Sequence, residues 1–153
     1  MKVWRIADDS YWQAAPEGAP WAQTVVAAGE LQGMKTAIHA LGDATDEDTP
    51  LVVVIKFPPN YVLPRHAHRS DRLELVVSGS LKVDGQWLHP GDIWASSAGE
   101  FYGPHVMGPD GCTTMELATV AGGHLLSFEV DGAAVDVDFS DPASLAAVGS
   151  LLQ

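Results

Sequence analysis

Short apolar segments separated by turn residues constrain the fold of this chain more than any other feature. The segments are rich in β-branched and aromatic residues, a composition that favours strands. A helical period of apolar residues is absent from most of the chain and becomes evident only near its end. We therefore expect an all-β protein with strands at 24–28, 34–41, 51–57, 73–79, 80–85, 92–97, 113–120 and 124–130.

Two stretches between these segments have the composition of tight turns. Asp84-Gly85 suits a two-residue hairpin loop, in which both residues adopt positive φ. The sequence GPDG at 108–111 suits another turn. Hairpins join antiparallel strands, so antiparallel pairing is expected throughout.

The C-terminal segment has a different pattern, which predicts one short amphipathic helix over residues 141–152. Ser140 or Asp141 can cap its N-terminus, and Pro142 suits its first turn. The apolar residues then recur at helical spacing, at Leu145, Val148, Leu151 and Leu152.

Length and composition predict one globular domain spanning residues 1–153. A chain of 153 residues with 46% hydrophobic content can bury a single core. Residues 1–49 would contribute N-terminal strands to it. The acidic stretch at 42–50 has no apolar pattern and is interpreted as a solvated loop.

The charge and the cysteine count limit the partners and the compartment. A formal net charge of −12 disfavours nucleic acid and anionic membranes as partners. The single cysteine, Cys112, cannot form an intramolecular disulfide, and no signal-peptide pattern is seen at the N-terminus. No apolar run approaches the roughly 20 residues of a membrane-spanning helix. A cytoplasmic protein is expected, and exposed sheet edges favour a homodimer formed by strand exchange or sheet packing.

The pair His66 and His68 is the first candidate for a functional site. On a strand, residues two apart project from the same face, so both imidazoles can turn toward one metal ion. Two histidines on the surface of an edge strand would have the same spacing. The pair alone leaves both interpretations open.

The residues around this pair resemble the first motif of the cupin superfamily. That motif runs from glycine through His-x-His and a glutamate to a second glycine. Asn60 stands at the first glycine position, His66 and His68 match, and Gly79 matches the last. Arg72 stands where the family has its glutamate ligand.

The sequence GDIWASSAGEFYGPH resembles the second cupin motif, which ends in a histidine ligand. Gly91 and Gly99 match, while Ser97 replaces a proline. Tyr102 stands at the histidine position, and His105 follows three residues later. His105 could serve as a ligand if the strand is shifted or bulged at this point.

The resemblance implies a cupin-type jelly-roll barrel, a double-stranded β-helix, with its core at about residues 50–130. It further implies one divalent metal ion, with iron foremost and zinc, nickel or manganese as alternatives. The implied ligands are His66, His68 and His105, with Glu74 as a further candidate because it shares a strand face with Arg72.

The resemblance also suggests catalytic roles for Arg72 and Tyr102. Arg72 would attract an enolate or carboxylate, and Tyr102 would offer a phenol. The alternatives are a salt bridge from Arg72 to Glu74 or Asp71, and a Tyr102 that only packs.

Three classes of function remain open from the sequence. The first is a metal-dependent enzyme acting on a small anionic molecule, such as a non-haem iron dioxygenase. The second is a ligand- or metal-sensing binding module. The third is a metal-independent epimerase or isomerase, which no clustered basic residues support.

Overall fold

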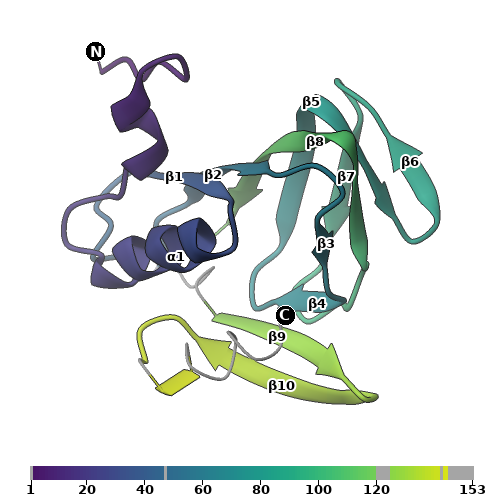
Figure 1. Ribbon diagram of the computed structural model, residues 1–153. Coiled ribbons are helices and arrows are strands. Elements are labelled where there is room, and N and C mark those ends of the chain that lie inside the picture. The colour runs from purple at the N-terminus through teal and green to yellow at the C-terminus, as the bar shows by residue number, and fades with distance from the viewer. Residues whose placement is uncertain (1, 47, 120–124, 142, 145–153) are drawn as a thin grey trace.

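The computed structural model describes residues 2–46, 48–119, 125–141 and 143–144, which form two antiparallel sheets and few helices (Figure 1). A seven-stranded sheet has the order β1-β2-β8-β5-β6, with β3 paired to β8 and β7 paired to β5. A three-stranded sheet has the order β10-β9-β4. The strands are β1 (Lys35–Ala40), β2 (Leu51–Phe57), β3 (Val62–Leu63), β4 (His66–His68), β5 (Arg72–Val83), β6 (Gln86–Leu88), β7 (Ile93–Ser96), β8 (His105–Ala118), β9 (Leu125–Val130) and β10 (Ala133–Asp138).

The all-β prediction is confirmed, but the predicted strand at 24–28 is wrong. Those residues lie within α1 (Pro20–Leu31), which follows a 3-10 helix, η1 (Asp9–Gln13). Pro20 stands in the first turn of α1, where its missing N–H costs nothing. Ala22, Val26 and Gly29 are buried at helical spacing. The helical period of these small residues was obscured by the β-branched pair in "TVVAA".

Helix α1 lies between the two sheets at one end of the barrel. In Figure 1 it runs beneath β1 and β2 and above β9 and β10. Ala22 and Val26 pack with Ile38 and Leu51 in one apolar cluster. The other side of α1 faces a second cluster, centred on Phe128. The helix therefore closes the end of the barrel toward which β4 presents its histidines.

The turn at Asp84-Gly85 is as predicted, whereas the turn at 108–111 is not. Asp84 and Gly85 have φ of 45° and 84° and connect β5 to β6. The 108–111 segment does not reverse the chain and lies within β8. Gly79 pairs with Cys112 and Leu81 with Met107, so four residues of β8 stand opposite Ser80 alone. The segment is an irregular bulge in a long strand.

Two further sequence predictions concern β5 and the C-terminus. The strands predicted at 73–79 and 80–85 fall mostly within one strand, β5, which continues through Gly79 and ends at Val83, before the Asp84-Gly85 turn. The predicted helix over 141–152 lies almost entirely outside the described residues. At its start, Asp141 Oδ1 accepts a hydrogen bond from the backbone N–H of Ala143.

The outer face of the large sheet carries exposed apolar residues in register across three strands. Leu73 pairs with Leu117, and Leu75 pairs with both Met115 and Ile93. Four of these five side chains are between 37% and 57% exposed, and Leu75 is half-buried. Such a contiguous apolar patch on a sheet is typical of a surface that associates with another protein.

In the part of the chain that the structure describes, no helix combines the length and the apolar character needed to span a membrane.

We predict that Gly79→Ala destabilises the protein because the backbone at this bulge has no room for a Cβ. Gly79 has a φ of 74°, and an added Cβ would overlap the carbonyl of Gly111. Strain and overlap together should lower the free energy of unfolding by more than ~2 kcal/mol in urea titrations. Gly85→Ala is the matched control, because its φ of 84° is similar but no atom lies near the added Cβ. The free energy of unfolding of Gly85→Ala should fall by only about 1 kcal/mol. Equal losses for the two variants would contradict the steric argument.

We propose that the apolar outer face joins two copies of the chain in a homodimer. Leu117→Lys would place a charge at the centre of that face, so it should sediment as a monomer at concentrations where the wild type is a dimer. Val62→Lys changes an exposed apolar residue on β3, outside the face, and should leave the dimer intact. A wild type that sediments only at 16.2 kDa would contradict the proposal.

Candidate functional site

Seven polar side chains from three strands and one loop converge inside the barrel. Each is less than a tenth exposed, although such residues usually face water. In β5 the residues alternate between the interior and the outer face, which directs two of them inward. All six site residues predicted from the sequence are in this group, which consists of His66, His68, Arg72, Glu74, Tyr102, His105 and Glu116.

The three imidazoles are close neighbours. The ring centroid of His66 is 5.1 Å from that of His68 and 5.2 Å from that of His105. His105 is only 2% exposed, so its ring lies in the interior and not toward solvent. The bulge in β8 is the strand irregularity that an inward His105 requires.

Hydrogen bonding fixes which nitrogen of His66 is available. Its Nδ1 lies 2.8 Å from the carbonyl oxygen of Pro64 and donates to it. This leaves Nε2 as the nitrogen with a free lone pair, the arrangement usual for a metal-binding histidine. His105 Nε2 is buried and has no hydrogen-bond partner among the described residues.

Burial keeps all three histidines neutral. It lowers the pKa of His66 to about 4 and that of His105 to about 3. Burial and then the nearby Arg72 guanidinium also lower the pKa of His68. Neutral imidazole is the form that can act as a metal ligand or as a general base.

Arg72 occupies the space between His68 and the opposite strand. Its Nη2 donates to Glu116 Oε2 in a buried ion pair, and its Nη1 contacts both ring nitrogens of His68, at 2.7 Å from Nε2. The salt bridge to Glu74 or Asp71 that the sequence suggested is not the one formed. Asp71 instead accepts a hydrogen bond from the backbone N–H of Ala98.

Glu74 and Glu116 face each other as direct partners on β5 and β8. Burial raises the pKa of Glu74 to about 7, and the neighbouring Arg72 charge opposes this rise. Glu116, the site residue that the sequence analysis missed, takes the guanidinium instead. The signal that could have revealed it is the alternation in "CTTMELA", where Cys112, Thr114, Glu116 and Ala118 share the inward face.

Tyr102 lies beneath the histidines and is joined to β4 by backbone hydrogen bonds with His66. Its ring centroid is 4.8 Å from that of His66 and 5.3 Å from that of His105. Burial raises the pKa of its hydroxyl to about 12, so the phenol keeps its proton at neutral pH. Tyr102 therefore contacts His66 and His105, and its catalytic role stays a prediction.

The side chains of the site are of types that bind metal ions. Their present arrangement, however, does not form a complete metal site. No three His, Cys, Asp or Glu side chains in the described ranges are grouped so that they could hold a metal ion. His66 and His105 fit as ligands, because each has a ring nitrogen that makes no hydrogen bond to the protein. His68 fits only when Arg72 moves away from its ring.

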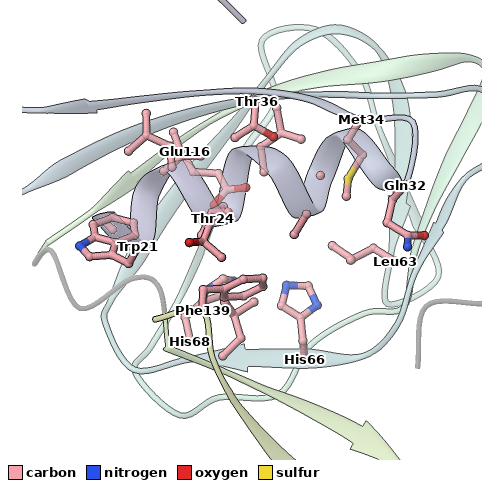
Figure 2. A pocket seen from close by; sticks show the side chains of 18 of the residues that line it. Trp21, Thr24, Gln32, Met34, Thr36, Leu63, His66, His68, Glu116 and Phe139 are labelled. Carbon is pink, nitrogen blue, oxygen red and sulfur yellow. The ribbon is translucent and has the colours of Figure 1, made fainter. Parts of the chain in front are cut away.

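A cavity of about 290 Å³ opens above His66, His68, Arg72 and Glu116. Figure 2 shows His66 pointing into it from below, with α1 behind and Phe139 beside it. Most of the remaining lining side chains are apolar. The site therefore combines a polar, buried floor with apolar walls, as small-molecule binding sites commonly do.

Comparison with known proteins shows similarity in structure alone. No protein-family model and no curated protein matches the chain. The acetylacetone dioxygenase of Acinetobacter johnsonii is similar over 96% of this chain and 93% of its own, with 12% identity and a TM-score of 0.57. An RmlC-like cupin protein of Ralstonia eutropha is similar over 87% and 80%, with 14% identity and a TM-score of 0.50.

A third match covers less. A chain in the complex of SigE with the anti-sigma ChrR from Rhodobacter sphaeroides is similar over 56% of the present chain and 45% of that one, with 20% identity and a TM-score of 0.47. The first two matches extend over most of both chains. The chain therefore has the fold of the RmlC-like cupins, the superfamily that its His66-x-His68 motif resembles.

Proposed function

We propose that the barrel interior binds one divalent metal ion and, beside it, a small organic anion. The observation that carries the proposal is the pair His66 and His105, which are neutral, buried and adjacent, each with a ring nitrogen that makes no hydrogen bond to the protein. A buried nitrogen acceptor without a partner is costly, and a metal ion would satisfy it.

The balance of charge supports a cation at this position. Two buried carboxylates, Glu74 and Glu116, face a single buried cation, Arg72, among the described residues. Arg72 pairs with Glu116, and its charge only partly offsets the burial that raises the pKa of Glu74. Uncompensated charge in a protein interior is unfavourable, and a divalent ion would reverse the deficit.

The ligands would be His66, His68 and His105, with Glu74 as a further oxygen donor. Coordination by His68 requires the Arg72 side chain to turn away from that ring. When bound, such an ion supplies Lewis-acid chemistry, and iron would add redox chemistry.

Arg72 and Tyr102 would then serve the organic ligand. With the ion in place, the charges of Arg72, Glu74, Glu116 and a divalent metal sum to about +1, a state that favours an anion. Arg72 can share its guanidinium between Glu116 and a ligand oxygen, because it has five N–H donors. Tyr102 keeps its proton and contacts His66 and His105 but does not line this cavity, so a hydrogen bond from its hydroxyl to the ligand stays a prediction. Oxidative cleavage of the ligand by an iron-loaded form stays a prediction, because the fold hosts many reactions.

We predict that the purified chain binds close to one equivalent of iron, zinc, nickel or manganese. His66→Ala and His105→Ala should each lower the affinity for the metal at least tenfold, because each removes one ligand. Metal content after dialysis and calorimetric titration would measure the effect. His89→Ala, at an exposed loop position, is the control and should bind as the wild type does. Failure of the wild type to take up any of the four metals would contradict the proposal.

We further predict that small carboxylates bind the metal-loaded protein more tightly than neutral molecules of the same size. In the metal-free protein this preference should disappear, because Glu74 and Glu116 offset Arg72. Arg72→Leu should weaken carboxylate binding about tenfold, and Arg72→Lys should retain part of it because the charge remains. Calorimetry with each variant would measure this. If charged and neutral ligands bind equally well to loaded wild type, the anion part of the proposal is wrong.

A further inference from the structure

The charged and imidazole side chains of the cavity above the histidines lie at one end only. Its charged and imidazole groups are His66, His68, Arg72 and Glu116, which come from β4, β5 and β8 and lie together on its floor. From there the cavity extends toward α1. A ligand that used only this floor would leave most of the 290 Å³ unfilled.

The walls above the floor are mostly apolar, with Thr24, Gln32 and Thr36 as polar exceptions, and they come largely from elements that the cupin motifs do not include. Helix α1 contributes Trp21, Val25 and Ala28. Leu126 and Phe128 of β9 face them, and Phe139 lies beside His68 in Figure 2. Apolar side chains therefore surround the cavity along its length from the floor to the helix.

The two apolar clusters on either side of α1 do not fill this space. Ala22 and Val26 belong to the cluster against β1 and β2, while Val25 and Ala28 pack at the edge of the cluster of Phe128, Val137 and Phe139. The side chains of α1 at this level are small, since Ala28 and Gly29 both line the cavity. Protein interiors are normally close-packed, so an apolar space of this size indicates room for a ligand.

We infer that the ligand is amphipathic, with an oxygen-bearing head group on the histidine floor and an aliphatic or aromatic body held against α1. The position of the head group in this inference rests on the proposed function. The apolar walls indicate in addition that the rest of the ligand is apolar. A bare short-chain acid would use only the floor. A molecule with an apolar body would remove the facing surfaces of α1 and β9 from water.

Two homologous series test the inference on the metal-loaded protein: linear carboxylates from acetate to octanoate, and 1-alkanols of the same lengths. The affinity should rise about fourfold for each buried CH₂ in both series, until the cavity is full. The slope with chain length tests the apolar body. The difference in affinity between a carboxylate and the alkanol of the same length tests the anionic head group. This difference therefore tests the proposed function separately.

Variants of α1 test whether this helix forms the wall that contacts the apolar body of the ligand. Ala28→Leu fills part of the cavity, so the rise should stop at a shorter chain, while acetate binds as to the wild type. Val25→Ala enlarges the cavity and should move the limit to a longer chain; it keeps the test decisive if Ala28→Leu folds poorly. Gln23→Leu is the control, because it introduces a leucine on the exposed side of α1. It should leave the affinities of both series unchanged.

The possible outcomes distinguish a failure of the inference from a failure of the proposed anionic head group. An affinity independent of chain length in both series would overturn the inference. A slope that is present but unaffected by both Ala28→Leu and Val25→Ala would also overturn it, because the apolar body would then bind elsewhere. A normal slope without any offset between carboxylates and alkanols would leave the inference standing and refute the anionic head group.

Discussion

The ion pair between Arg72 and Glu116 determines the character of the barrel interior. Arg72 stands at the position where cupins have a glutamate ligand, and a buried guanidinium without a partner would be too costly for the fold to bear. Glu116, directly across from Glu74 on the neighbouring strand, supplies that partner. Burial, more than this pair, keeps the three histidines neutral and raises the pKa of Glu74; the Arg72 charge further lowers the pKa of the histidines and opposes the rise for Glu74. The pair therefore allows a charged guanidinium to stand in the interior beside three neutral imidazoles.

The barrel and helix α1 make different contributions to the site. Antiparallel strands hold the polar floor in fixed register, because every inward residue is tied to its neighbours by ladder hydrogen bonds. The helix covers the floor and has no such ties to it; it packs through small apolar residues that leave space between two clusters. The floor is therefore suited to chemistry, which depends on precise positions, and the helix wall to selection by size and shape.

The polar floor was largely predictable from the sequence, whereas its wall was not. His-x-His spacing, alternation along β5 and the glycine landmarks singled out six of the seven residues of the polar group described above, and their roles stay predictions. The partner of Arg72 was not predictable because, although Glu116 lies within the strand predicted at 113–120, the sequence does not show which strand pairs with β5 or in which register. Helix α1 was missed because propensity favours strands for adjacent valines, while packing of Ala22, Val26 and Gly29 against the barrel determines the outcome. Local patterns identify faces of strands well; they do not show which surface a short apolar segment will cover.

The bulge at 108–111 has a consequence for how this site could arise. His105 and Glu116 are eleven residues apart, an odd number, so in a regular strand they would lie on opposite faces of the sheet. The extra residues opposite Ser80 change the phase of the strand, and both side chains face inward. Losing or gaining one residue in this segment would turn His105 outward without altering its neighbours in the sequence. The length of this bulge, and not only the identity of a ligand residue, thus decides whether a barrel of this kind has a third imidazole. A sequence alignment with gaps at this bulge will misplace that histidine.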